Sequence, residues 1–379
     1  AKQSKAKQSK AKQSKAKPLL YLLNNFKFYI PQFFMAFKSL SVFIQFAKIK
    51  KSFLTSINLD SLSEGIKNLR LVINKFNFLQ KEYIRMKNIK IIFTFLLFIF
   101  ISSIAFAIGT VEEKTMYSQT LGRDIKYKVY LPKDYNNGEN FNVFFLLHGL
   151  YGNEKDWTDT QQGSASVIFD ELIYETEAIE PMVVIMPDGG NTWYIDSKEK
   201  IQTAYEKDLF PFIFQNYKVS KERDKAIIGG LSIGGMGSLN FFLRNPEIFG
   251  RVILLNPAVY DKLTDEFLEV STVTQKDMFN SYWRNNLENY KNKNSANEFK
   301  SEIYIVIGDD DNLVNSEGKE DFQERTVSIY RELKNLGNNV ELRIVNGGHI
   351  WKVWRDGLRQ GLITTDKNLK IRNGFSTVD

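Results

Sequence analysis

Side chains that together carry out nucleophilic acyl transfer occur at separate points of this 379-residue sequence. Ser232 lies in GGLSIGG, three adjacent aspartates occupy residues 309–311 in GDDDNL, and His349 lies in NGGHIW. A serine hydroxyl becomes a nucleophile when a histidine accepts its proton and a carboxylate orients that histidine. If the fold brings these residues together, they predict attack on a carbonyl carbon and an acyl-enzyme intermediate.

Ser232 stands among four glycines, and residues 230–234 match the pattern G-x-S-x-G. The pattern follows an apolar run and precedes MGSLNFFLR, which we expect to form a helix. At a strained strand-to-helix turn the hydroxyl projects above the sheet, and larger side chains two residues away would collide. The alternative is that the glycines only allow a tight turn. In the nucleophile interpretation, the N–H of Ile233 is one donor to the oxyanion.

The chain contains only two histidines, His148 and His349. His148 directly follows an apolar run in LLHGLYG, where the turn can supply the second oxyanion donor, which we assign to the N–H of Leu150. We expect His148 itself to hold that turn through local hydrogen bonds rather than to act as the general base. His349 is the only histidine after Ser232, so the required order of residues selects it as the base.

Short apolar runs alternate with longer amphipathic segments through residues 108–379. Several runs are continuously apolar, which is typical of strands buried on both faces of a parallel sheet. The alternation predicts an α/β fold with right-handed crossovers, in which Ser232, the aspartates and His349 all follow strands. The predicted strands are 126–130, 143–147, 182–186, 226–229, 252–255, 303–307 and 340–344, and the predicted helices are 164–176, 201–215, 236–244, 321–336 and 354–362.

Residues 261–300 do not continue this alternation. They contain MFNSYWR and the polar run NYKNKNSANEFK. We expect an insertion over the carboxyl edge of the sheet, where ligands bind in open α/β folds. No second catalytic domain is evident, so residues 108–379 are expected to form one domain.

The three aspartates leave the identity of the acid open. A solvated acidic turn or a cation site is the alternative, although the spacing is not that of an EF-hand loop. The order serine, aspartate, histidine is that of the α/β hydrolases. We therefore predict an α/β-hydrolase fold, with a mainly parallel central sheet and helices on both faces, and neither a metal nor an organic cofactor.

The chain resembles the serine esterases of the esterase D type, which include tributyrin, feruloyl and acetyl-xylan esterases and S-formylglutathione hydrolases, with the mycobacterial mycolyltransferases as relatives. That family commonly carries its acid in a G-x-x-D pattern, which implies Asp311, with Asp309 in reserve. It commonly has methionine where Ile233 stands, and only the backbone is needed there. The resemblance runs from about Ser118 to Leu362 and rests on residues 121–135, 146–157, 186–196, 230–239, 307–314 and 347–354.

Aromatic residues near the motifs indicate a substrate class. Trp193 and Tyr194 follow a strand end and, with Trp283 of the insertion and His148, are the candidate substrate-binding residues. We expect an exported esterase acting on short-chain or aromatic acyl esters of carbohydrates, with a small-molecule or oligosaccharide ester as its partner. A cytoplasmic thioester fits export poorly, and residues 261–300 show no strongly apolar lid for a long-chain lipase.

Two other functions remain open. The same triad would serve an acyltransferase of the mycolyltransferase type, which acceptor alcohols would reveal through ester products. A non-catalytic carbohydrate-binding relative would have no need of Ser232, Asp311 and His349 together. The oligomeric state is not predicted.

The segment before residue 108 reads as a leader. Residues 86–107 contain a basic start, an apolar stretch and an A-x-A site, as in a signal peptide. Residues 91–108 would otherwise serve as a membrane anchor, since 18 residues reach the lower limit for spanning. Residues 1–85, which begin with three AKQSK repeats, are interpreted as an extension outside the native protein, with Met86 as the initiator and Ile108 as the first mature residue.

The net charge differs between the predicted leader and the rest of the chain. Residues 1–107 hold 19 basic and 3 acidic residues, whereas the remainder holds 32 basic and 41 acidic residues, a net charge of −9. The predicted mature chain has no basic stripe, which argues against nucleic acid as a partner. The sequence has no cysteine, which excludes disulfides, a thiolate nucleophile and a cysteine-based zinc site.

Overall fold

The computed structural model describes residues 109–366, apart from 261, 282, 295–297 and 312–321, together with helical residues 74, 75, 77, 78, 81 and 82. The chain divides into two compact units, residues 1–98 and 99–379, and the second unit carries the fold described below. The signal peptide expected over 86–107 lies outside the described residues, as does most of the extension expected over 1–85. Within the described ranges, no helix combines the length and apolar character needed to span a membrane.

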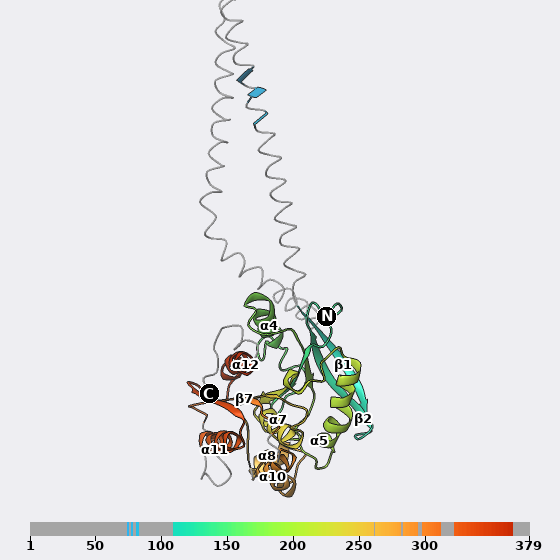
Figure 1. Ribbon diagram of the computed structural model, residues 1–379, viewed down its shortest axis with the longest axis vertical. Helices are drawn as coiled ribbons and strands as arrows, with labels where there is room; N and C mark the ends of the chain where they lie inside the picture. Colours follow the sequence, from blue (N-terminus) through green and yellow to red (C-terminus); the bar gives the residue numbers. More distant parts are fainter. Residues whose placement is uncertain are drawn as a thin grey trace, which may run out of the picture. The chain divides into compact units, whose positions relative to one another are not determined.

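An eight-stranded sheet forms the centre of the second unit, in the order β1-β2-β4-β3-β5-β6-β7-β8 (Figure 1). The β1–β2 and β2–β4 pairs are antiparallel and the other pairs are parallel, which confirms the predicted mainly parallel sheet. The strands are β1 (Thr110–Ser118), β2 (Arg123–Leu131), β3 (Asn142–Leu147), β4 (Met182–Pro187), β5 (Ala226–Leu231), β6 (Arg251–Leu255), β7 (Glu302–Gly308) and β8 (Asn339–Val345).

Both faces of the sheet are covered, as the apolar runs predicted. Along β3, Phe144 and Leu146 enter one core while Phe145 and Leu147 enter the other, so a continuous apolar run is needed. Helices α4 and α12 pack on the first face, and α5, α6, α7, α10 and α11 pack on the second, an arrangement that Figure 1 shows on either side of the sheet. The chain thus has the layered architecture of the predicted α/β fold.

The helices predicted from the sequence are all present. Helix α7 begins at Ile233, three residues before its predicted start, because two glycines in its first turn weaken the local helix signal. The helical segments are α4 (Ala165–Asp170), η3 (Glu171–Glu175), α5 (Ile201–Ala204), η4 (Tyr205–Leu209), α6 (Phe210–Asn216), η5 (Arg223–Lys225), α7 (Ile233–Arg244), α8 (Asp265–Val270), α9 (Gln275–Asn280), α10 (Trp283–Lys293), α11 (Phe322–Asn335) and α12 (Trp351–Thr365).

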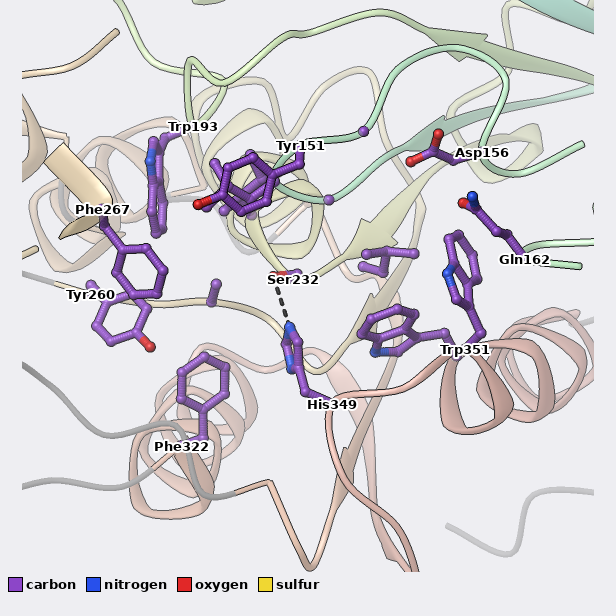
Figure 2. A pocket seen from close by; sticks show the side chains of 17 residues that line it. Tyr151, Asp156, Gln162, Trp193, Ser232, Tyr260, Phe267, Phe322, His349 and Trp351 are labelled. Carbon is purple, nitrogen blue, oxygen red and sulfur yellow. Dashed lines mark hydrogen bonds between the residues drawn. The ribbon is translucent and has the colours of Figure 1, made fainter. Parts of the chain in front are cut away.

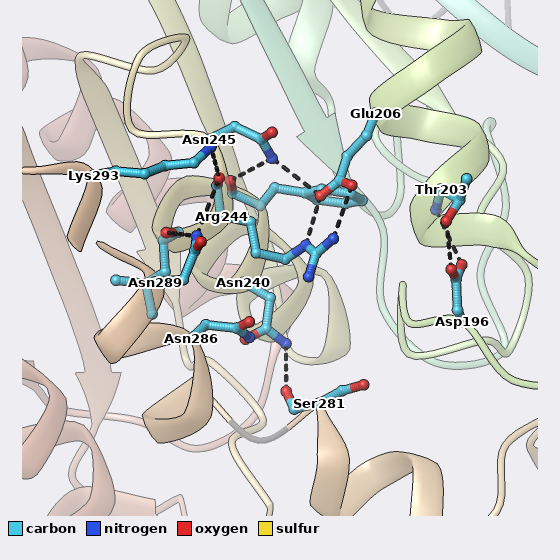
Figure 3. Close-up of polar contacts among 12 residues, drawn as sticks. Asp196, Thr203, Glu206, Asn240, Arg244, Asn245, Ser281, Asn286, Asn289 and Lys293 are labelled. Carbon is cyan, nitrogen blue, oxygen red and sulfur yellow. Dashed lines mark hydrogen bonds and ion pairs between the residues drawn. The ribbon is translucent and has the colours of Figure 1, made fainter. Parts of the chain in front are cut away.

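Three of these helices, α8, α9 and α10, occupy the segment expected as an insertion. Helix α10 packs beside α7, where the side-chain amide of Asn286 donates to Oδ1 of buried Asn240 at 2.9 Å. Asn240 in turn donates to the carbonyl of Ser281, which precedes α10 (Figure 3). The segment therefore helps to cover one face of the sheet, and α8 also contributes to the cavity described below.

Strand β1 is a described strand that the apolar runs do not predict. Its sequence, TVEEKTMYS, leaves most side chains exposed, and only Met116 and Ser118 are buried. As an edge strand it pairs with β2 alone and covers little of the core, so charged side chains are tolerated along it.

The end of α7 distant from Ser232 is held by the polar network in Figure 3. The carboxylate of Glu206, in η4, accepts hydrogen bonds from Nε and Nη2 of Arg244 at 2.7 and 3.1 Å. It also accepts one from Nδ2 of Asn245 at 3.1 Å. One carboxylate therefore joins the last turn of α7 to η4.

Replacing Glu206 with alanine is expected to lower the free energy of unfolding by about 1–3 kcal/mol, because Arg244 and Asn245 lose a partly buried acceptor. The matched control is Glu247→Ala, which removes a surface contact of 3.1 Å to Nζ of Lys293 and should cost less than about 1 kcal/mol. Chemical denaturation followed by circular dichroism measures both, and equal losses would contradict the special position of Glu206.

Candidate active site

Ser232 occupies the turn between β5 and α7 in a strained backbone conformation. Its φ and ψ are 54° and −121°, a region that residues other than glycine rarely adopt. Its N–H donates to the carbonyl of Leu255 at 3.0 Å, and its own carbonyl accepts from the N–H groups of Gly235, Met236 and Ala258. The neighbouring backbone therefore fixes the strained turn that presents the side chain.

The glycines on either side of Ser232 are needed for packing at this turn. A Cβ on Gly230 would lie 2.7 Å from the carbonyl oxygen of Leu147, and one on Gly234 would lie 2.5 Å from that of His148. Both distances are shorter than real Cβ contacts, and the obstacles are backbone atoms at the end of β3. The glycines thus allow the turn to sit directly against the loop that follows β3.

The structure brings Ser232, Asp311 and His349 together in a hydrogen-bonded line. Nε2 of His349 lies 2.9 Å from Oγ of Ser232, and Nδ1 lies 2.8 Å from Oδ2 of Asp311 (Figure 2 shows the first contact). Asp311 is only 2% exposed, and the side chain of His349 is 23% exposed. With the Nδ1 proton donated to Asp311, the lone pair of Nε2 can accept the serine proton.

The two aspartates considered as the acid have different contacts. Asp311, which follows β7, also accepts a hydrogen bond at 2.5 Å from the side-chain amide of Asn256. Asp309 is exposed and accepts from the N–H of Gly347 at 2.9 Å, in the loop that carries His349. The carboxylate of Asp311 therefore faces the histidine, whereas Asp309 supports its loop.

Asn256 was not singled out by its sequence context. It directly follows β6, has a φ of 44°, and its N–H donates to the carbonyl of Val306 at 2.8 Å. Its position after a strand, at the same sheet edge as Ser232 and Asp311, is the signal that could have indicated it.

The two residues whose N–H groups were assigned to the oxyanion hole both border the cavity beside Ser232. Leu150 and Ile233 line it, and neither N–H has an acceptor within the described part of the chain. The next N–H after Leu150, that of Tyr151, donates to Oδ1 of Asn191 at 2.9 Å, which fixes the loop. Two unoccupied donors at this point can stabilise negative charge on a carbonyl oxygen.

His148 is buried and makes one hydrogen bond within its own turn, as expected, and two to the loop that follows β4. Its Nδ1 lies 2.7 Å from the carbonyl of Gly149, and its Nε2 accepts from the N–H of Gly189 at 2.9 Å. Its carbonyl accepts from the hydroxyl of Tyr194 at 3.1 Å. The side chain does not line the cavity and so does not contact a ligand there.

The aromatic residues predicted to bind substrate separate into two groups. Trp193 lines the cavity, and its indole N–H donates to Oγ of Ser271 at 2.8 Å, directly after α8. Tyr194 and Trp283 are both buried in the core and are not part of the cavity lining. Buried tryptophan and tyrosine side chains commonly serve packing, and sequence position alone does not separate the two uses.

A cavity of about 490 Å³ opens over Ser232 (Figure 2). Several of its lining residues carried no signal in the sequence, because they come from loops and helix ends far apart along the chain. Burial raises the pKa of Tyr260, and the nearby charge of Asp311 adds to this effect. The lining residues are Gly149, Leu150, Tyr151, Gly152, Asp156, Gln162, Trp193, Leu231, Ser232, Ile233, Ala258, Tyr260, Phe267, Phe322, His349, Trp351 and Trp354.

Comparison with known families agrees with this geometry. The Esterase family model, described as "Putative esterase", matches residues 118–365, which contain the whole sheet except most of β1 and all three residues of the hydrogen-bonded line. The chain belongs to this esterase family. It is a carboxylic ester hydrolase with an α/β-hydrolase fold, as the resemblance to esterase D-type enzymes implied.

Individual relatives of this esterase are distant. An acetyl esterase from Caldicellulosiruptor saccharolyticus is 26% identical over 268 residues, which are 63% of this chain and 91% of that protein. An endo-1,4-beta-xylanase/feruloyl esterase from Xylanibacter ruminicola is 31% identical over 163 residues, and this esterase matches only 22% of that protein's length. A solved ferulic acid esterase superposes with a TM-score of 0.57 at 22% identity, covering 68% of this chain and 98% of that one, which supports the shared fold.

Proposed function

We propose that this esterase is exported and hydrolyses short-chain or aromatic acyl esters of carbohydrates through an acyl-enzyme on Ser232. The observation that carries the proposal is the hydrogen-bonded line from Ser232 through His349 to Asp311, with the serine on a strained turn beneath an open cavity. This arrangement has the nucleophile, the base and the orienting carboxylate that ester cleavage needs.

The proposed mechanism begins when Nε2 of His349 accepts the proton of Ser232 as Oγ attacks the ester carbonyl carbon. The carbonyl oxygen gains negative charge and accepts hydrogen bonds from the N–H groups of Leu150 and Ile233. Asp311 stabilises the resulting imidazolium. His349 then donates the proton to the departing alcohol, which leaves the acyl group bound to Ser232.

A water molecule completes the cycle. It attacks the acyl-enzyme carbonyl as Nε2 of His349 accepts one of its protons, and the same two backbone donors hold the second oxyanion. Collapse of this intermediate releases the carboxylic acid, and the proton returns from His349 to Ser232. An acceptor alcohol in place of water would give a new ester, the reaction of the alternative acyltransferase.

Two observations support the choice of substrate. Relatives include proteins named as an acetyl esterase and as a feruloyl esterase. The cavity is lined largely by aromatic side chains, which pack well against a flat aromatic acyl group.

Export is supported by the basic, apolar and A-x-A pattern of residues 86–107. N-terminal sequencing of the protein recovered outside the cytoplasm should show Ile108 as the first residue.

Hydrolysis of a panel of esters by the full chain tests the proposal. We expect turnover of p-nitrophenyl acetate, an early burst of p-nitrophenol from acyl-enzyme formation, and release of free acid from methyl ferulate or acetylated xylose. Excess glycerol or trehalose should not divert the acyl group into new esters. Predominant ester products would favour the acyltransferase, and no turnover of any ester by the folded protein would overturn the proposed substrate class.

A further inference from the structure

The cavity has two chemically different sides, with Ser232 between them. Figure 2 places Trp193, Tyr260, Phe267 and Phe322 on one side of the serine. It places Asp156, Gln162 and Trp351 on the other. An ester also has two parts that extend in different directions from its carbonyl carbon, the acyl group and the alcohol.

The first side is a continuous aromatic wall. The ring of Tyr260 lies 5.9 Å from that of Trp193, 5.9 Å from that of Phe267 and 5.4 Å from that of Phe322, measured between centroids. A sugar placed there would exchange the water around its several hydroxyls mainly for carbon atoms, with the hydroxyls of Tyr260 and Tyr151 as partners. Because unpaired polar groups are costly to bury, this side suits an acyl chain or ring.

The second side carries polar groups on a rigid loop between β3 and α4. Trp157, adjacent to Asp156, is buried, and its indole N–H donates to the carbonyl of Leu147 at 3.0 Å. The carbonyl of Asp156 accepts from the N–H of Gly163 at 3.1 Å, and that of Gln162 accepts from the guanidinium of Arg355 in α12. The backbone that carries both polar side chains is therefore held in place before a ligand arrives, which limits the entropy lost on binding.

The indole of Trp351 completes this side. Its ring packs edge-on against Trp157, with centroids 5.3 Å apart, and against Trp354, with centroids 5.1 Å apart. Trp354 packs in the same way against His349 at 5.0 Å. An indole held in this manner offers a fixed apolar surface at one end of the cleft, next to a carboxylate and an amide.

We propose that Asp156, Gln162 and Trp351 form the subsite for the alcohol part of the substrate, and that this part is a neutral sugar. This inference rests on the proposed function and adds to it the place and charge of the alcohol. Sugar hydroxyls donate to the carboxylate of Asp156 and exchange hydrogen bonds with the amide of Gln162, while the C–H face of the ring packs on Trp351. The acyl group lies along the aromatic wall.

The electrostatics of Asp156 favour this occupant. Burial raises the pKa of Asp156 above its ordinary value, while nearby His148 and a hydrogen bond from the backbone of Asn153 partly oppose this rise in pKa. A partly buried carboxylate still gains from hydrogen bonds that a ligand donates. The same negative charge repels phosphorylated sugars and uronic acids. The subsite is thus expected to discriminate by charge as well as by hydrogen bonding.

Two esters of ferulic acid, methyl ferulate and feruloylated arabinose, test the subsite because they share the acyl group and differ in the alcohol. If only acetyl esters react, methyl acetate and acetylated xylose replace them. We expect the full chain to favour the sugar ester in kcat/KM by about tenfold or more, since two or three added hydrogen bonds need contribute only about 1.4 kcal/mol. Asp156→Ala and Gln162→Ala should each reduce this ratio toward one.

The matched control is Asp159→Ala, which removes the same charge from the same loop at an exposed position outside the cavity lining. It should keep the sugar preference of the parent enzyme. A ratio near one in the unmodified enzyme, or an unchanged ratio in folded Asp156→Ala, would overturn the inference while leaving the esterase proposal intact.

Binding measured without turnover separates the two proposals. Methyl arabinofuranoside or xylobiose, added to the full chain carrying Ser232→Ala, should change the tryptophan fluorescence, and the change should be lost with Trp351→Phe. If no ester is hydrolysed but the sugar binds in this way, the proposed function fails and the subsite stands. If esters are hydrolysed but neither sugar produces a Trp351-dependent change at millimolar concentration, the subsite fails.

Discussion

Replacing Ser232 with alanine is expected to reduce kcat for p-nitrophenyl acetate by a factor on the order of 10⁴–10⁶, because the acyl-enzyme can no longer form. The oxyanion donors and the cavity remain, so a small residual rate and a similar KM should persist. A fluorophosphonate probe, which reacts with an activated serine, should label the parent protein and leave the variant unlabelled. Steady-state kinetics and mass spectrometry of the labelled protein measure both effects.

Ser238→Ala is the matched control for this change. Ser238 lies further along α7, and its hydroxyl donates to the carbonyl of Gly234 at 2.7 Å rather than to a histidine. Its replacement also removes one hydroxyl from the same helix, so activity and labelling should be retained. If folded Ser232→Ala kept its activity, the glycines around residue 232 would have a packing role alone and another nucleophile would have to be sought.

The residues of the hydrogen-bonded line could be found in the sequence because strand ends mark them. Continuous apolar runs identify the buried strands β5 and β7, which Ser232 and Asp311 follow. His349 follows β8, a partly exposed outer strand, at the same carboxyl edge of the sheet. The strained turn at Ser232 also requires glycines at fixed distances along the chain, which leaves a local pattern. The positions of these three residues in space can therefore be predicted from their order along the chain and from the glycines around Ser232.

The walls of the cavity leave no comparable pattern. Tyr260, Phe267 and Phe322 come from a loop, α8 and the start of α11, and they meet only because the fold brings these segments together. Trp283 and Tyr194 are also aromatic, yet they are buried in the core. Which face of a short helix points inward depends on its packing partners, and these are not encoded locally.

Strand β1 and Asn256 show two further limits of sequence reading. The polar sequence of β1 forms a strand because its backbone pairs with β2, and edge pairing does not require an apolar pattern. Asn256 resembles any polar residue after a strand until its contact of 2.5 Å with Asp311 is known. Both depend on a partner that is distant in sequence.

Replacing Asp311 with alanine is expected to lower kcat by about 10³- to 10⁴-fold, with a much smaller change in KM. The carboxylate holds the proton on Nδ1 of His349 and stabilises the imidazolium, and both effects act on the transition state more than on substrate binding. Labelling of Ser232 by the fluorophosphonate probe should slow by a similar factor. Kinetics with p-nitrophenyl acetate and the time course of labelling provide the two measurements.

The neighbouring aspartates supply controls that remove the same charge. Asp310→Ala should leave kcat near that of the parent, because Asp310 is exposed. Asp309→Ala should reduce it by no more than about tenfold, since it costs the loop of His349 one hydrogen bond, that from the N–H of Gly347. Thermal melts establish that each variant is folded. A larger loss in Asp309→Ala than in folded Asp311→Ala would transfer the role of the acid to Asp309 and would require the loop of His349 to rearrange during catalysis.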